Sequence, residues 1–72
     1  MAPIIFVALV GDGTPCWRPI HGIHLRDDVY QISSEVPPDE RWEFSTGDHV
    51  RCRKQAFADG KSGWVAYEKL AV

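Results

Sequence analysis

The chain has 72 residues, of which 44% are hydrophobic, and eight Lys and Arg against ten Asp and Glu give it a formal net charge of −2. This length fits one domain, residues 1–72, and a domain of this size buries only about 60% of the surface that its unfolded chain exposes. Three Trp, three Phe and two Tyr make a packed globule rather than a disordered segment. The acidic excess argues against nucleic acid as a partner, because a single-strand binder needs a positive groove beside its aromatic residues.

The first predicted element is a strand from Ile4 to Val10, an unbroken apolar run rich in β-branched side chains. The run is too short to span a membrane and lacks the basic start and cleavage site of a signal peptide, so we expect a cytoplasmic protein with no membrane partner. Both faces of this strand are apolar, whereas a strand of an antiparallel sheet usually has one face in solvent. Either the tail around Leu70 and Val72 or a second subunit must cover the second face, and we expect a homo-oligomer.

Turn residues from Gly11 to Pro15 lead into a second predicted strand, Cys16 to Leu25. Pro19 and Gly22 predict a bend or bulge in this strand, because proline cannot donate to a ladder and glycine weakens one. Within it, three side chains have the same parity and would share one face: Trp17, Ile23 and Leu25.

A short reversal at Asp27-Asp28 predicts a hairpin into a third strand, Val29 to Ile32, with Tyr30 and Ile32 on its inner face. The polar segment from Ser33 to Glu40 then reads as a connection with at most one helical turn, because Pro37-Pro38 exclude sheet.

The stretch from Trp42 to Arg53 joins an aromatic segment to a charged one through the turn sequence Ser-Thr-Gly-Asp. At period two, Trp42 and Phe44 would share one strand face, and Val50 and Cys52 one face of the next strand. The segment from Ala58 to Lys61 contains the Asp-Gly pair of a hairpin.

That hairpin connects the strand Val50 to Phe57 with a returning strand, Gly63 to Tyr67, and Glu68 to Val72 either adds a 3₁₀ turn or continues as strand. Five short strands separated by turns predict an all-β fold, a small five-stranded barrel, because closure removes the exposed edges of so small a sheet.

Two motifs resemble the SH3-like barrels. The segment from Glu43 to Val50 is similar to the diverging turn of an SH3 domain, and Asp59 to Val65 is similar to its distal hairpin and following strand. The resemblance covers Trp42 to Leu70 and implies the SH3-like barrel. Ala66 and Lys69 stand where the family's peptide groove has a Pro and a Tyr, so the resemblance does not imply a proline-rich ligand. The chain as a whole also resembles short uncharacterised bacterial proteins.

Residues that could carry catalysis or bind a metal are sparse. His21 and His24 would lie on opposite faces of a strand, and no Cys-x-x-Cys element is present, so we expect no metal and no cofactor. Cys16 and Cys52 allow one disulfide, but free thiols are the expectation in the cytoplasm. Cys52 lies near His49 in sequence, yet an inward-facing thiol on a strand is inert.

Paired carboxylates at Asp27-Asp28 and Asp39-Glu40 lie in predicted turns, where they would be solvated. A general acid instead needs a pocket that desolvates it. We therefore expect no catalytic residues and no enzyme.

The aromatic residues carry the functional hypothesis. Three tryptophans are too many for this core to bury completely, so at least one should reach the surface beside an arginine and anchor a protein or peptide partner. The predicted binding residues are Trp17, Trp42, Trp64, Arg51 and Arg53. The simpler interpretation is that all three tryptophans pack in or across the barrel.

The sequence thus predicts a non-enzymatic interaction module that self-associates through its N-terminal strand. The alternative is a minimal enzyme or small-molecule binder whose site forms only at the centre of a homo-oligomer.

Overall fold

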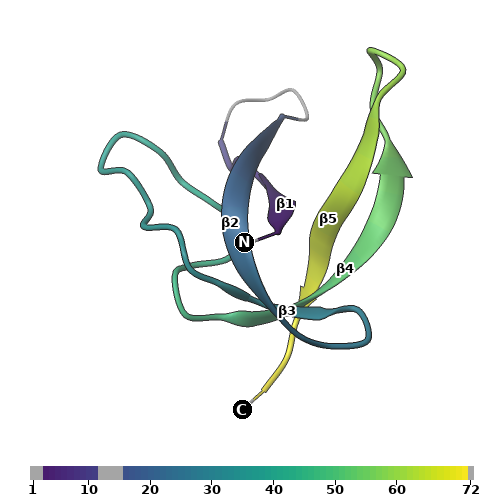
Figure 1. The fold of residues 1–72 in the computed structure, drawn as a ribbon. Coiled ribbons are helices and arrows are strands. Elements are labelled where there is room, and N and C mark those ends of the chain that lie inside the picture. Colours follow the sequence, from purple (N-terminus) through teal and green to yellow (C-terminus); the bar gives the residue numbers. More distant parts are fainter. Residues whose placement is uncertain (1–2, 12–15, 72) are drawn as a thin grey trace.

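The structure is a computed structural model that describes residues 3–11 and 16–71. Within these residues the chain forms five strands and no helix (Figure 1). The strands are β1 (Ile4–Ala8), β2 (Trp17–Arg26), β3 (Val29–Ile32), β4 (His49–Ala56) and β5 (Ser62–Lys69). They form one closed barrel in the order β1-β2-β3-β4-β5. The predicted all-β fold and the small five-stranded barrel are confirmed.

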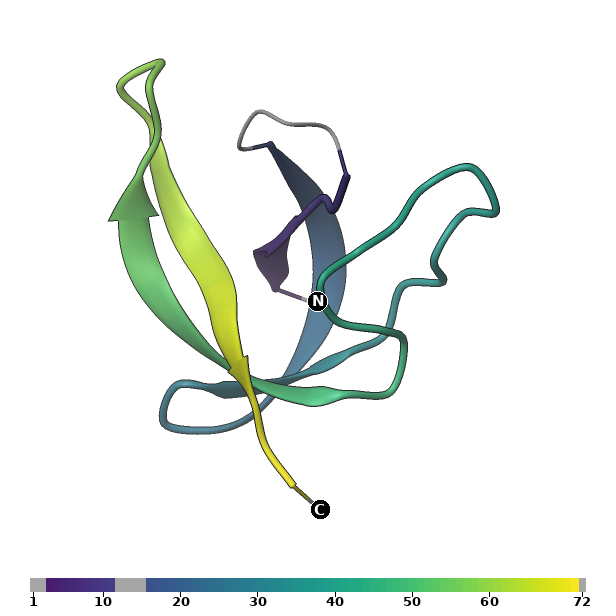
Figure 2. The same ribbon diagram turned by 180° about the vertical axis from the view of Figure 1, so that it is seen from behind.

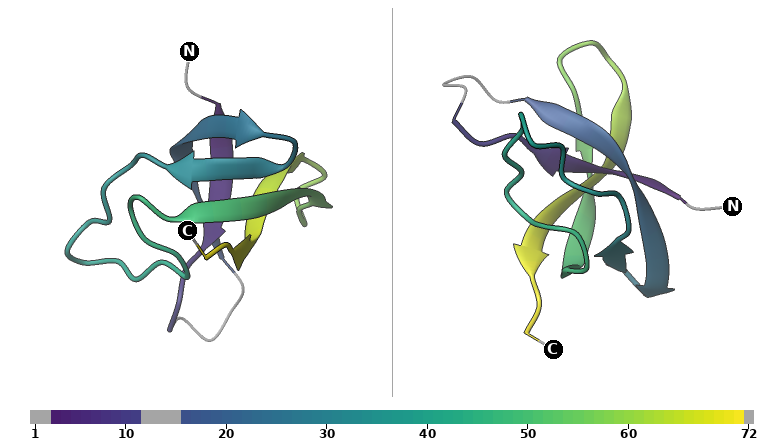
Figure 3. Two further views of the ribbon diagram at one scale, coloured as in Figure 1. Left: turned by 90° about the horizontal axis from the view of Figure 1, so that it is seen from below. Right: turned by 90° about the vertical axis from the view of Figure 1, so that its left-hand side faces the viewer.

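Each strand pairs antiparallel with the next, and the barrel closes through a parallel contact of β5 with β1, where Phe6 lies opposite Val65. The β4–β5 hairpin projects from one end of the molecule, and the C-terminal residues leave at the other end (Figures 1 and 2). Residues 33–48 form a long connection that projects to one side (Figure 3). Closing the ring pairs β5 with β1, so the sheet is not left with two open edge strands.

The barrel interior is filled by alternate residues of the strands. Ile5 and Val7 of β1 are completely buried, as is Val50 of β4. The interior cluster consists of Ile5, Val7, Ile20, Ile32, Val50, Cys52 and Ala66, and three partly buried aromatic residues pack against it: Tyr30, Trp42 and Phe44. Burying one such aliphatic side chain contributes about 1.5–3 kcal/mol, so this cluster dominates the stability of the fold.

Strand β2 is regular where a bulge was expected. Its register with β1 is unbroken from Trp17 to His21, and the irregularity lies instead between His24 and Arg26, beside the turn. Hydrogen bonds alternate along this ladder from the bond between the Gly22 amide and the Pro3 carbonyl, so Pro19 falls at a position that needs no amide donor. Of the bend or bulge predicted between Pro19 and Gly22, the bulge is therefore wrong.

The interior face of β2 carries Ile20 and Gly22, and the other parity, with Trp17, Ile23 and Leu25, faces outward. Glycine at position 22 leaves room for Ile5, whose Cδ1 would lie 3.1 Å from a Cβ placed there.

The turn between β2 and β3 is tight, with Asp27 in the left-handed region at φ 42°. Its carbonyl lies 2.7 Å from the His24 Nε2 atom. Ile32 is buried on the inner face of β3 as predicted, and Tyr30 packs against the interior cluster from a partly buried position. Val29 is also buried but does not belong to the interior cluster.

The predicted aromatic strand at Trp42 and Phe44 is wrong. Trp42 makes one isolated bridge, to Leu9, through bonds from the Val10 amide to the Arg41 carbonyl (2.8 Å) and from the Glu43 amide to the Ala8 carbonyl (2.9 Å). The ladder stops there, and Trp42 and Phe44 instead place their rings on the interior cluster from an irregular segment. Their period-two spacing reflects that packing.

Both predicted turns of the C-terminal half are confirmed. Gly47 has φ +88°, and the Ser45 amide donates to Asp48 Oδ2 over 2.8 Å. In the β4–β5 hairpin, Gly60 has φ +89° and the Phe57 amide donates to the Lys61 carbonyl over 2.7 Å. Positive φ is the reason that glycine is required at these two positions.

Strand β5 continues to Lys69 without a 3₁₀ turn, and Leu70 donates its amide to the His49 carbonyl of β4. Leu70 therefore extends the pairing with β4 rather than with β1. Val72 and residues 12–15 of the predicted turn lie outside the described residues.

Candidate interaction surface

The outer face of β1 is apolar and partly open to solvent. Ile4 and Phe6 alternate with the buried Ile5 and therefore point away from the interior, and Ile4 is 46% exposed. Ile4 pairs with His21 on β2, so Ile23 lies diagonally next to it on the same face. Three exposed aliphatic side chains lie on β1 and β2, and we call them the outer strip: Ile4, Ile23 and Leu25.

At the end of this face that adjoins the β4–β5 hairpin, three aromatic rings from three different strands or loops come together. The Phe57 ring lies 4.9 Å from that of Phe6 and 5.5 Å from that of Trp17, measured between centroids. The interplanar angles of 57° and 49° exclude a flat stack, and tilted pairs of this kind add about 0.5–1.5 kcal/mol each beyond their buried area. Beside the rings lies a surface groove of about 350 Å³, the aromatic groove, lined by Phe6, Trp17, Phe57, Ala58 and Asp59.

Gly63 makes this cluster possible. A Cβ at position 63 would lie 2.5 Å from Cε1 of Phe6 and 3.3 Å from Cε2 of Phe57. A glycine within a strand often marks such a close approach. The neighbouring Val65 is only 4% exposed, although it does not belong to the interior cluster. With Phe6, its partner in β1, it forms a second apolar layer outside the barrel.

The structure places the three tryptophans in three different environments. Trp17 is half-buried in the aromatic groove, and Trp42 packs on the interior cluster and donates its Nε1–H to Glu40 over 2.9 Å. Trp64 is 43% exposed on β5, opposite Lys54. One tryptophan therefore reaches the surface, as expected, but the three do not form one contact surface.

Both predicted arginines face outward and are engaged with neighbours other than tryptophan. Arg51 Nε lies 3.9 Å from a Glu68 carboxylate oxygen and 4.0 Å from one of Asp28. The Arg53 guanidinium lies over the Tyr67 ring, 5.1 Å from its centroid, in cation–π geometry. Their role as partners in binding stays a prediction.

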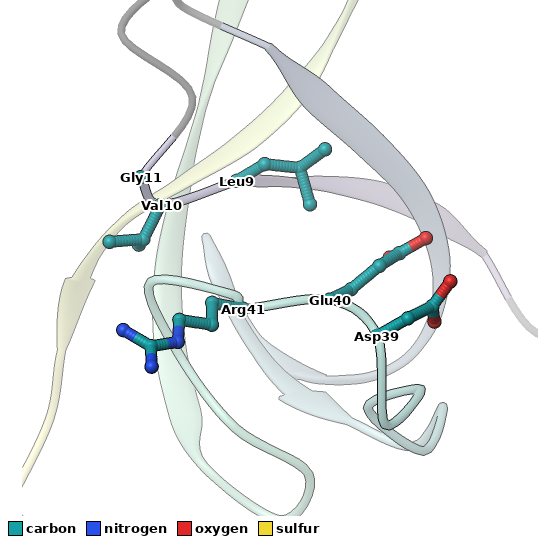
Figure 4. A pocket seen from close by; sticks show the side chains of 6 residues that line it. All are labelled: Leu9, Val10, Gly11, Asp39, Glu40 and Arg41. Atoms are coloured by element: carbon teal, nitrogen blue, oxygen red, sulfur yellow. The ribbon is translucent and has the colours of Figure 1, made fainter.

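A second, more polar feature lies at the side of the barrel where residues 33–48 return. Arg18 binds the Glu40 carboxylate with both Nε and Nη2, and Trp42 donates to the same carboxylate. The hydrogen bond from Trp42 and then that from Arg18 lower the pKa of Glu40. A depression of about 310 Å³ adjoins this residue, and in Figure 4 Arg41 points away from Asp39 and Glu40. Because Glu40 is already bound by two donors, we assign it a structural role.

The structure also places the side chains that could bind a metal or act as nucleophiles. No three His, Cys, Asp or Glu side chains lie together as a metal site would require within 3–11 and 16–71. Both cysteines are free, Cys16 exposed and Cys52 buried. Burial, and secondarily the charge of Asp28, raises the pKa of the Cys52 thiol to about 12. A thiol with that pKa is a poor nucleophile at neutral pH.

Sequence reasoning missed the aromatic groove. Phe57 lies just past the last residue of β4, and only the curvature of the hairpin brings its ring to Phe6 and Trp17. The one available signal was Gly63, a glycine inside a predicted strand, which indicates that another group approaches the backbone closely.

Comparison with known proteins gives no match to a family model, a curated protein or a solved structure. The resemblance to SH3-like barrels and to bacterial proteins therefore stays a prediction. In the part of the chain that the structure describes, no helix is long and apolar enough to cross a membrane.

Proposed function

We propose that this chain is a small, non-enzymatic interaction module whose outer strip binds protein, and that its partner at this strip is a second copy of the same chain. The exposure of Ile4 and Ile23, two neighbouring aliphatic side chains each almost half open to solvent, carries the proposal. Small domains with a limited core often gain stability by covering such a face with another copy. A C₂ dimer would place each strip on its own equivalent.

The size of the strip indicates a weak association. A stable interface covers about 800 Å² on each partner, whereas the whole surface of this chain is 4919 Å². Three half-exposed aliphatic side chains supply only part of that area. We therefore expect a monomer–dimer equilibrium that shifts with protein concentration.

The experiment is a measurement of solution mass by light scattering over a wide range of protein concentration. The unaltered chain should shift from monomer towards dimer, and the variant Ile4→Lys/Ile23→Lys should stay monomeric, because two lysines cannot be buried against their equivalents. Val10→Lys is the matched control: Val10 is 49% exposed but lies beside Arg41 rather than on the strip. Circular dichroism checks that each variant is folded.

A monomer at every concentration of the unaltered chain would contradict the proposal. Assembly that persists unchanged in the Ile4→Lys/Ile23→Lys variant would show that copies associate through another face.

A further inference from the structure

The aromatic groove has the composition of a binding site rather than of a packing defect. Among the described residues, its lining is three aromatic rings, one alanine and one aspartate. The volume of about 350 Å³ lies at the small end of the range for ligand pockets, about 300–1,000 Å³. It is therefore suited to one compact chemical group.

The tilt of the rings favours a compact group over a flat one. Phe6 and Trp17 both lean on Phe57 at angles near 50°, so the wall offers no single plane for stacking. Gly63 is needed for this arrangement, because any side chain there would collide with Phe6 and Phe57. The site is consequently held in shape by the fold itself.

The charge of the groove favours a cation. Asp59 is the one charged side chain among the lining residues, and aromatic faces attract cations through their quadrupole, by about 0.5–2 kcal/mol per ring. Arg53 over Tyr67 shows the same attraction elsewhere on this chain.

The number of hydrogen-bond acceptors distinguishes between kinds of cation. Asp59 Oδ1 already accepts the Lys61 amide over 3.0 Å, and no other described side chain that lines the groove carries a hydrogen-bond acceptor. A guanidinium brings five N–H donors and an ammonium three, and donors left without acceptors lose binding energy. A fully methylated ammonium keeps the charge and has no N–H to satisfy.

We infer that the aromatic groove binds a methylated ammonium group on the side chain of a protein partner, a trimethyllysine. The rings contact the methyl groups, and the Asp59 carboxylate supplies the compensating charge. This site uses side chains other than those of the outer strip, and the Ile4→Lys/Ile23→Lys variant separates peptide binding from self-association in the test.

The experiment is a calorimetric titration of the full chain with short peptides that differ only at one lysine. A trimethyllysine peptide should bind at least about tenfold more tightly than the unmodified peptide, a difference within reach of two cation–π contacts. The neutral isostere, with a carbon in place of the charged nitrogen, should bind as weakly as unmodified lysine. Choline should bind more weakly than the trimethyllysine peptide, because it lacks the peptide backbone.

Variants connect the binding to the groove. Phe57→Leu keeps an apolar side chain but removes the central ring, and Asp59→Asn removes the charge, so each should weaken trimethyllysine binding by about tenfold. Trp64→Leu is the matched control, because Trp64 is exposed but does not line the groove. The Ile4→Lys/Ile23→Lys variant should bind the peptide as the unaltered chain does.

Three results would overturn the inference. Equal affinity for the neutral isostere would mean that the groove selects apolar volume alone. Choline binding as tight as the peptide would exclude a protein side chain as the source of the group. Absence of saturable trimethyllysine binding by folded protein would exclude the site.

Discussion

Cys52 is the residue whose chemistry the fold changes most. It is 1% exposed among aliphatic side chains, and desolvation raises the pKa of its thiol to about 12. Cys16, by contrast, lies at the surface before β2. The same functional group is therefore protected at one position and accessible at the other.

This contrast predicts one reactive thiol per folded chain. An aromatic disulfide reagent at mildly alkaline pH should modify Cys16 alone, and both thiols once the chain is unfolded, because the reagent reaches only the exposed group and burial raises the pKa of the Cys52 thiol. Absorbance of the released product gives the count. Modification of both thiols in the native state would contradict the buried position of Cys52.

The same shift sets a dependence of stability on pH. The folded-state pKa of Cys52 lies above its ordinary value of 9.0, so its contribution to the free energy of unfolding is complete below about pH 9 and declines as pH rises towards 12. The pKa of Tyr30 is also raised, chiefly by burial, and acts in the same direction. Urea unfolding at several alkaline pH values should show this decline, and Cys52→Ala should weaken it.

At the scale of elements, the connection of residues 33–48 depends on a few polar contacts. Glu40 ties it to β2 through Arg18, Trp42 bridges to Leu9, and Thr46 Oγ1 donates to the Ser34 carbonyl over 2.6 Å. Such a long segment without regular structure needs contacts of this kind to keep one conformation.

We expect Glu40→Gln to loosen this connection at neutral pH. The lowered pKa of Glu40 means that its ionised form is favoured in the folded state, so its contribution is present above the ordinary Glu value and is lost as pH falls through the lowered one. The indole N–H signal of Trp42 in NMR spectra should shift, and its hydrogen exchange should become faster. Glu35→Gln, an exposed change on the same connection, should leave the signal unchanged. An unshifted indole signal in Glu40→Gln would contradict the assigned role.

The elements that the sequence predicted well are those in which local chemistry decides the backbone. The Asp59-Gly60 hairpin and the Gly47 turn need positive φ, and glycine marks both. The aromatic segment at Trp42 was misread because alternation reports which side chains meet the core, not whether a neighbouring strand is available. Strand β2 stays regular at Pro19 because this position donates no hydrogen bond to β1. Which positions donate is set by the pairing of the whole strand.

For the candidate site the same reasoning reached less far. The sequence indicated that β1 has two apolar faces and that tryptophans would matter, and Trp17 does line the groove. It did not indicate Phe57 or Asp59, because both come from a hairpin whose curvature carries them across β5 and β1. Contacts between residues so distant in sequence are fixed by the closed ring.

For the whole molecule, the interior cluster sets an upper limit on stability. A single core in a chain of this length rarely supplies more than about 3–5 kcal/mol. We expect one cooperative urea transition of that size, with a midpoint that rises with protein concentration, because dimer formation favours the folded state by mass action. The Ile4→Lys/Ile23→Lys variant should lose the concentration dependence. A midpoint independent of concentration in the unaltered chain would count against the dimer.

The closure of the barrel joins the first strand to the last, with Phe6 of β1 opposite Val65 of β5. A ribosome releases β1 early and β5 late, so the nascent chain holds a strand with two apolar faces before the strand that completes the ring exists. Folding that depends on such distant contacts is slow, and uncovered apolar strands aggregate. The ring therefore cannot close until β5 has been made, and before that the apolar faces of β1 are open to association with other chains.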